Sequence, residues 1–359
     1  MVMKSTDTEK IKQMRFDRFV RMMSLYKAGL ARRLGETRKL FGRKVLSIDI
    51  HIHSNHSDGK GTVKDIYDSM KNAGLDFVFV TDHTSLQQKR AMRKLPNMSW
   101  GQEPVSRDSN RRHWMHHIGL LCGRRRFYPR CDSTAADFER ARQIAPFVWI
   151  PHPVGWGNTW AGSNWYPEAW VRALWTLGDE FAMEVMSGAG KLVRAYDAFD
   201  QKAIEVWDQL LCDGKKVTAL GGTDAHVPDS IGTVWSGVFA PQRRASSIIK
   251  TLKQGRCFAS EASLIDFWCN GQPMGQTVRR RKGAAMKLSF RVADSAGIAS
   301  IRIISRGKIV KEIDVKAKSV LQGKLSIRLG SEETYYRLES TASDDRRAFS
   351  TPIYVKPTK

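Results

Sequence analysis

The sequence predicts an α/β protein with an all-β domain at its C-terminal end and a basic helix at its N-terminal end. Over residues 45–260, short apolar runs alternate with segments of helical period, as in a parallel sheet or barrel. Over residues 261–359 the pattern changes to strict alternation interrupted by turn signals, which is typical of a small β-sandwich. All nine histidines lie between positions 51 and 226, so we expect the chemistry in the middle part.

The composition is that of a soluble globular protein, and a chain of 359 residues is expected to form two or three domains. A formal net charge of +23 raises the local concentration of anions, whether nucleic acid, anionic lipid or a phosphorylated metabolite. No apolar stretch is long enough to cross a membrane, and the charged N-terminus lacks a secretory pattern. The five cysteines are scattered without a CxxC pair, so we expect reduced thiols in a cytoplasmic protein.

Residues 1–44 are strongly basic, with 13 Lys and Arg against four acidic residues. Apolar residues recur there at helical spacing, namely Phe16, Phe19, Val20, Met23, Leu30 and Leu34. The pattern predicts a basic amphipathic helix. One interpretation is an arm that binds nucleic acid or an anionic membrane surface. We favour a helix that packs on the main domain with its basic face in water, because periodic apolar stripes usually belong to a core.

In the middle part, apolar runs and helical periods follow one another along the chain. We expect strands over 45–52, 77–80, 147–150 and 216–220, and helices over 63–73, 135–144 and 203–211. In parallel α/β folds, catalytic residues lie at the carboxyl ends of the strands. A polar, histidine-containing cluster closes or follows each of the four expected strands. The sequence therefore predicts a site on that rim.

The first of these clusters is the run DIHIHSNHSDG at residues 49–59. His51 and His53 are two positions apart on the expected strand, so both imidazoles project from one face. Asp58 follows in a turn closed by Gly59 and can bring a carboxylate to the same place. Two imidazoles and a carboxylate presented together indicate a metal site.

The other three clusters have the same character. They contain His83 in the sequence TDH, His152 in PHP, and Asp224 and His226 in GGTDAH. A single histidine of this kind is more often a hydrogen-bonded, half-buried side chain, but four strand-end clusters together indicate metal binding. Imidazole with carboxylate suits Zn, Mn or Fe. More than four such ligands exceed one tetrahedral ion, so we expect two or three ions that activate water and stabilise an anionic transition state.

These four motifs, HxH…SDG, TDH, HP and DAH in this order, resemble the PHP (polymerase and histidinol phosphatase) superfamily of metal-dependent phosphoesterases. The run LKQGRCFASEAS at 252–263, followed by Gly271 and Gly275, resembles the end of the barrel in the CehA/McbA branch, where a β-sandwich commonly follows. The resemblance implies a distorted seven-stranded (β/α) barrel over 45–260 and a sandwich over 261–359. It also implies a cluster of up to three divalent ions, Mn, Zn or Fe.

The resemblance also implies roles for individual residues. His51 and His53 hold one ion with Asp224; Asp58, His83 and His226 hold another; and His152 holds a further one. A bridging glutamate between TDH and HP matches Glu103 in the sequence GQE, although a glutamate there could also lie on a surface loop. The family then has one more histidine, for which His116 and His117 are candidates and His117 is preferred. All of these except His116 and His117 are also the candidate catalytic residues.

Three further groups are candidates for the surroundings of the site. Glu184 matches an EV strand motif of the family and is expected to orient a ligand or substrate. Trp156 and Trp160 lie in a Gly-rich loop and could contact an apolar or planar part of the substrate. Arg111, Arg112 and Arg124 to Arg126 could bind an anion or simply form a solvated face.

The leading functional hypothesis is hydrolysis of a small anionic phosphate ester by a metal-bound hydroxide. Cleavage of a carboxylic or carbamate ester at the same site is an alternative, and so is a phosphodiesterase that processes nucleic acid. A non-catalytic scaffold is the alternative from another class. It is disfavoured because an idle barrel has no reason to keep the full set of ligands.

Overall fold

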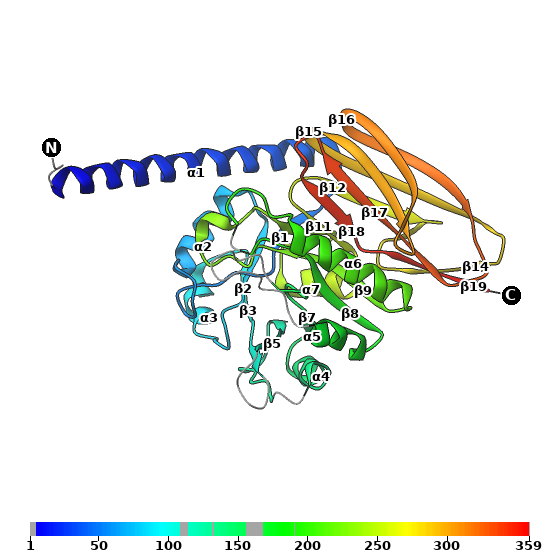
Figure 1. Cartoon of the computed structure of the whole chain (residues 1–359), viewed down its shortest axis with the longest axis horizontal. Coiled ribbons are helices and arrows are strands. Elements are labelled where there is room, and N and C mark those ends of the chain that lie inside the picture. The colour runs from blue at the N-terminus through cyan, green and yellow to red at the C-terminus, as the bar shows by residue number, and fades with distance from the viewer. Residues whose placement is uncertain (1–4, 108–113, 131–132, 156–167, 190, 359) are drawn as a thin grey trace.

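The computed structural model describes residues 5–107, 114–130, 133–155, 168–189 and 191–358. Figure 1 shows a long helix, a mixed α/β part and a β-rich part at the C-terminal end. The helix, α1, spans Ser5–Phe41. Within the described residues, no helix is long and apolar enough to cross a membrane.

The α/β part extends from β1 to β11. Its strands are β1 (Leu46–Asp49), β2 (Phe77–Val80), β3 (Met98–Gln102), β4 (Val105–Arg107), β5 (Trp114–His117), β6 (Gly119–Leu121), β7 (Phe147–Trp149), β8 (Glu180–Ser187), β9 (Lys216–Gly222), β10 (Trp235–Val238) and β11 (Cys257–Ser260). Its α-helices are α2 (Val63–Asn72), α3 (Gln88–Ala91), α4 (Thr134–Ile144), α5 (Glu168–Ala173), α6 (Ala198–Cys212) and α7 (Ala245–Lys253). Each strand and helix expected from the sequence in this part has its counterpart here, but β1 ends at Asp49, so His51 lies beyond the strand on which it was expected.

Helix α6 begins five residues before the expected start. The chain is capped there by Asp197, whose side chain accepts hydrogen bonds from the N–H groups of Phe199 and Asp200, and the Asp200 carboxylate accepts from the Asp197 N–H in return. This reciprocal capping box ties up amide donors that the first turn would otherwise leave unsatisfied. The spacing of apolar residues alone does not predict the residue at which this helix begins.

When the strands of the α/β part are followed from neighbour to neighbour, the pairings lead from β1 back to β1. β1, β2 and β3 are parallel neighbours, and β6 and β7 follow antiparallel. A parallel bridge from Ile150 to Met183 continues to β8, which is parallel to β9. A second parallel bridge, from Ala225 to Ile52, leads from the end of β9 back to the end of β1. The carboxyl ends of β1, β2 and β9 therefore lie on one rim, where the histidine motifs follow.

The C-terminal part contains β12 (Leu264–Cys269), β13 (Gln272–Pro273), β14 (Thr277–Arg281), β15 (Ala285–Ser305), β16 (Lys308–Arg328), β17 (Thr334–Ala342), β18 (Arg347–Ser350) and β19 (Ile353–Thr358). β15 and β16 form a long hairpin that turns at Arg306 and Gly307, both with positive φ. The alternating residues Leu288, Val292 and Ile301 are buried. β11 pairs with β18, so one sheet runs from the α/β part into the C-terminal part.

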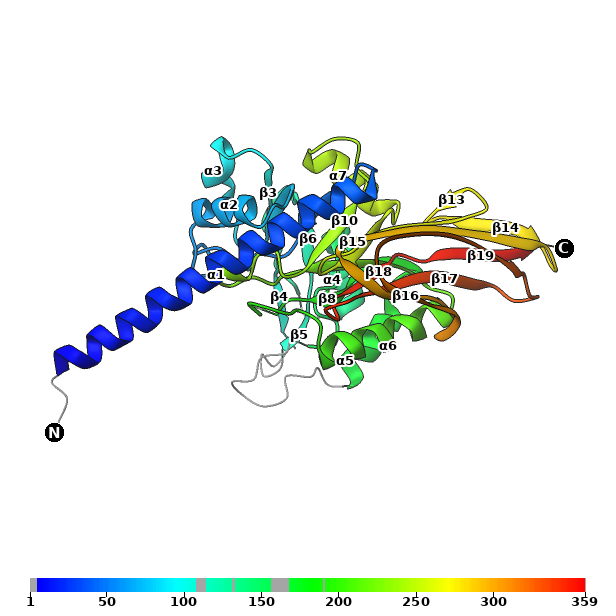
Figure 2. The ribbon, with the colours of Figure 1, turned by 90° about the horizontal axis from the view of Figure 1, so that it is seen from above.

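The C-terminal half of α1 packs on the body, next to α2 and β15 (Figure 2). Met23, Leu34 and Phe41 are buried on this face. Arg33 is anchored by ion pairs to Asp294 at 2.8 Å and to Asp344 at 2.6 Å. The N-terminal half of the helix extends beyond the rest of the molecule, and the side chains of Phe16, Phe19 and Val20 lie outside the described residues.

Candidate metal centre

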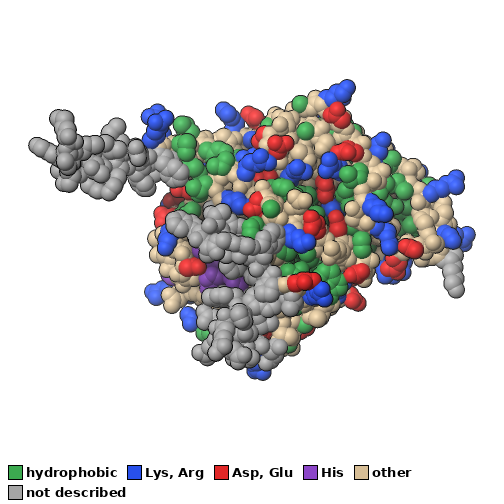
Figure 3. Space-filling view, in the orientation of Figure 1, with side chains coloured by type: hydrophobic (Ala, Val, Ile, Leu, Met, Phe, Trp, Pro, Cys, Tyr) green, Lys and Arg blue, Asp and Glu red, His purple; other side chains and the backbone are tan. Residues whose placement is uncertain are grey.

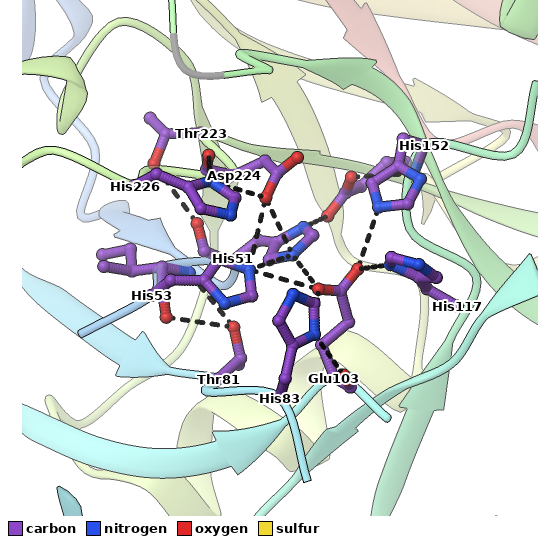
Figure 4. A network of polar contacts seen from close by, with 12 residues as sticks. His51, His53, Thr81, His83, Glu103, His117, His152, Thr223, Asp224 and His226 are labelled. Carbon is purple, nitrogen blue, oxygen red and sulfur yellow. Dashed lines mark hydrogen bonds and ion pairs between the residues drawn. The ribbon is translucent and has the colours of Figure 1, made fainter. Parts of the chain in front are cut away.

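The motif residues converge on one place, although they come from six strand ends. His51 and His53 follow β1, His83 follows β2, Glu103 follows β3, His152 follows β7, and Asp224 and His226 follow β9. His117 is the last residue of β5, and Asp58 lies in the loop after β1. Figure 4 shows His51, His53, His117 and His152 around the Glu103 carboxylate, while the His226 ring lies beside His53.

Glu103 lies at the centre of the cluster and is 1% exposed. Its Oε1 atom is 2.7 Å from His117 Nδ1 and 2.8 Å from His152 Nε2. Its Oε2 atom is 3.1 Å from His53 Nε2 and 3.2 Å from His51 Nε2. Burial disfavours the charged carboxylate, but the surrounding histidines outweigh it and hold the pKa of Glu103 well below its usual range. His83 Nδ1 lies 3.4 Å from the same Oε2 atom, so the carboxylate sits among five imidazoles.

His51 is held in one orientation by Glu184. Glu184 Oε1 is 2.9 Å from His51 Nδ1 and accepts a hydrogen bond from Trp149 Nε1 at 3.1 Å, while Oε2 accepts from the His152 backbone N–H at 3.0 Å. This arrangement places the proton on Nδ1 and leaves Nε2 free as a ligand atom. Glu184 is buried and contacts the His51 ring and the His152 backbone.

His83 and His226 form the open side of the cluster. Their Nδ1 atoms lie 2.8 Å and 3.0 Å from the backbone carbonyl oxygens of Glu103 and Asp224, and their Nε2 atoms lie 3.4 Å and 3.2 Å from Asp58 Oδ2. Burial opposes protonation, but Asp58 and the neighbouring carboxylates raise the pKa of both histidines to about 9. Figure 3 shows histidine side chains reaching the surface on this face.

The carboxylates of this rim are ionised. Despite burial, contacts with His51, His53 and His226 lower the pKa of Asp224, and contacts with His226, His83 and His53 likewise lower the pKa of Asp58. Asp224 and His152 also have positive φ values of 49° and 28°, which are uncommon for residues with a side chain. Such local strain is retained where the surrounding contacts fix the backbone, and it is frequent at functional sites.

Three overlapping groups of side chains have ligand atoms within 4.8 Å of one another. They are His53, Asp58, His83 and His226; then His51, His53, Glu103 and Asp224; and finally His83, Glu103 and His117. His53 belongs to the first two groups and Glu103 to the last two, so neighbouring positions share ligands. His53 Nδ1 is buried and makes no hydrogen bond to any described residue. The donor set and this nitrogen fit divalent metal ions.

Two buried carboxylates that support the rim were not singled out from the sequence. Asp82 accepts hydrogen bonds from the Ser54 backbone and hydroxyl, both at 2.7 Å, and from the Ser57 hydroxyl at 2.8 Å. Asp49 accepts from the Thr223 N–H at 3.1 Å and from the Thr223 hydroxyl. Burial raises the pKa of Asp49 to about 7, against the effect of these bonds. Both residues lie next to or near motif histidines in the sequence, and this position is the feature from which their role could have been inferred.

The remaining candidates do not form part of the described cluster. Arg124 lines a cavity of about 1030 Å³ with residues that begin β7, β8 and β9, at the ends of these strands remote from the motifs. Arg124, Arg125 and Arg126 are exposed, which agrees with the solvated face that the sequence also allowed. The net charge of the sequence does not tell at which end of the strands an individual arginine lies. Trp156, Trp160, Arg111 and Arg112 lie outside the described residues, as does the side chain of His116.

Fold and site together define a class: an α/β protein with clustered histidine and carboxylate side chains that could hold metal ions. Residues 211–257 match the family model described as PHP-associated, a stretch that contains Asp224 and His226. No curated protein matches the chain.

The chain is similar to several solved structures. One is a two-domain protein from Bacteroides vulgatus that contains a predicted PHP-like metal-dependent phosphoesterase, with 18% identity over 87% of this chain and 95% of that one, at a TM-score of 0.47. Another is PsfC from Pseudomonas syringae, with 16% identity, 58% and 88% coverage, and a TM-score of 0.40. A third is described as a metal-dependent phosphoesterase from Bifidobacterium adolescentis, with 13% identity, 51% and 88% coverage, and a TM-score of 0.34.

Proposed function

We propose that this chain is a PHP-type metal-dependent hydrolase that acts on small phosphate esters. The observation that carries the proposal is the sharing of His53 and Glu103 between adjacent groups of ligands. A buried carboxylate that faces two groups at once suits ions held side by side. Bound divalent ions would supply a water of lowered pKa and positive charge beside the ester oxygens.

We propose distinct roles for the residues of this chain. Glu103 and His53 hold adjacent positions together, and Glu184 fixes the ring of His51 so that Nε2 faces the centre. Asp58, His83 and His226 supply the half-exposed side, where an ester can approach.

Phosphate is favoured over a carbon ester by charge. The formal charge of +23 favours an anionic substrate, because it raises the encounter rate with anions. We further propose that residues 45–260 form the catalytic domain as a distorted seven-stranded (β/α) barrel of the CehA/McbA-like branch. Residues 261–359 would be an accessory sandwich.

The test is hydrolysis of an aryl phosphate, an aryl phosphodiester and an aryl carboxylate ester by the purified protein with Mn²⁺. A matched pair of variants separates the site from its surroundings, because His53→Ala removes a shared ligand while His56→Ala removes a histidine of the same loop that belongs to none of the three groups. Turnover of a phosphate ester that is lost only in His53→Ala supports the proposal. Turnover of the carboxylate ester alone would contradict the phosphate assignment, and equal activity of the two variants would contradict the site.

A further inference from the structure

A lysine of α1 contacts the loop that carries His226. Lys27 is 6% exposed, and its ammonium donates a hydrogen bond to the Pro228 carbonyl oxygen at 2.6 Å. It also contacts the Ser69 hydroxyl of α2 and lies 3.4 Å from Asp229 Oδ1. The Ser69 hydroxyl donates to the same Pro228 oxygen at 2.5 Å. Two side chains from two helices therefore hold one backbone carbonyl.

The loop held by Lys27 is joined to the loop that carries Asp58. The Lys60 N–H donates to the carbonyl oxygen of His226 at 2.7 Å. The ring of Pro228 packs against Gly61 so closely that a Cβ atom on Gly61 would lie 2.3 Å from Pro228 Cγ. Pro228 therefore packs against the segment that follows Asp58 and lies two residues after His226.

The deeper ligands do not depend on this contact. His51 and His152 are held by Glu184, which lies on β8. The attachment of α1 does not depend on it either, because Arg33 pairs with Asp294 and Arg38 pairs with Asp76. Taking an ammonium group out of water is unfavourable, and burial lowers the pKa of Lys27 against the effect of Asp229. Since α1 has these other anchors, we assign the main effect of this costly buried cation to the loop that it contacts.

We propose that Lys27 is a positioning residue for the group His53, Asp58, His83 and His226, so that α1 is a structural component of the metal site. The inference rests on the proposed function, because it requires that these four residues hold an ion. It implies that displacement of this turn of α1 weakens the half-exposed ion position and leaves the buried position around Glu103 in place.

The test is Mn²⁺ binding to the full-length chain by calorimetry, with Lys27→Met as the variant. Methionine keeps the length and apolar stem of lysine and removes the ammonium. We expect at least tenfold weaker binding of one class of ion and unchanged binding of the other. Asp58→Asn identifies which class is the half-exposed one, and Lys27→Met added to it should weaken that class little further, because both changes act on the same position. Excess Mn²⁺ should restore the hydrolytic rate of Lys27→Met.

Arg33→Met is the matched control, since it removes another cation of α1, one that is partly buried and contacts β15 rather than the loop. It should lower the melting temperature and leave Mn²⁺ binding unchanged. Ser69→Ala removes the other donor to the same carbonyl and should weaken binding of the same class of ion about threefold. This variant provides the test if Lys27→Met does not fold. Wild-type Mn²⁺ binding in Lys27→Met, or in Ser69→Ala if only that variant folds, would overturn the inference, as would equal weakening by Arg33→Met. Absence of Mn²⁺ binding in the wild type would instead contradict the proposed function itself.

Discussion

Two buried polar networks in this molecule differ in how their charges are compensated. In the first, Arg337 of β17 is 2% exposed, and its guanidinium donates to Asp208 of α6 at 2.9 and 2.6 Å and to Glu339. In the second, Glu103 lies among imidazoles whose protons can leave. Arginine stays charged at every accessible pH, whereas the ring nitrogens of histidine can exchange a proton for a metal ion.

The comparison shows that buried charge alone does not define a site. All three guanidinium nitrogens of Arg337 have carboxylate acceptors, and Tyr335 adds a further donor to Asp208 at 2.7 Å, so this network is complete and joins α6 to the C-terminal sheet. Around Glu103, ligand atoms converge within 4.8 Å of one another, and His53 Nδ1 makes no hydrogen bond within the described part of the chain. Convergent lone pairs, rather than charge, distinguish the candidate metal centre.

The largest effect is expected from Glu103→Gln, which breaks the second network at its shared carboxylate. We expect the rate of phosphate ester hydrolysis to fall on the order of 10³-fold, because the positions that share Glu103 lose their common negative charge. Metal content by mass spectrometry should fall by at least one ion per chain. An active variant with full metal content would contradict the role given to Glu103.

Arg337→Met breaks the first network. We expect the free energy of unfolding to fall by about 3–5 kcal/mol, because Asp208 and Glu339 are left as partly buried carboxylates without the guanidinium. Chemical denaturation measures this loss. Metal content per folded chain should stay at the wild-type value, and a loss of metal equal to that of Glu103→Gln would remove the distinction between the two networks.

Glu184→Gln sharpens the comparison within the metal centre. The amide is isosteric with the carboxylate but no longer stabilises the Nδ1–H of His51 as an anion does, so metal affinity should fall about 10- to 100-fold. Calorimetry with Mn²⁺ measures the change. Unaltered affinity would mean that Glu184 serves packing alone.

The response to pH should have opposite signs with and without metal. In the metal-free chain the pKa of His83 and His226 is raised to about 9 from 6.5, so their ion pairs stabilise the fold below pH 6.5 and this contribution is lost as pH rises through 9. Metal binding requires the neutral rings, so Mn²⁺ affinity should rise over the same interval, by up to about tenfold per pH unit for each proton released.

Thermal unfolding at pH 6.5 and pH 9 under argon, with and without Mn²⁺, checks both signs. The melting temperature of the metal-free chain should fall between the two values, while the increase caused by Mn²⁺ should grow. An increase that is the same at both pH values would show that His83 and His226 are not ligands.

Much of the rim could be predicted because its signals are local. The apolar run 77–80 and the motif that follows it are contiguous, so the structure places β2 at Phe77–Val80 with His83 just beyond its end. Contacts between distant segments left no such pattern. The bond from Lys27 to Pro228 spans 201 positions, and the pairing of β11 with β18 joins parts that the sequence separates at residue 260.

The central claim is that adjacent metal positions share Glu103, and anomalous diffraction from a crystal grown with Mn²⁺ tests it most directly. The account predicts at least two neighbouring peaks, one on each side of Glu103, with His53 in contact with one of them. A map without a peak at Glu103, or with a single ion that neither Glu103 nor His53 contacts, would contradict it.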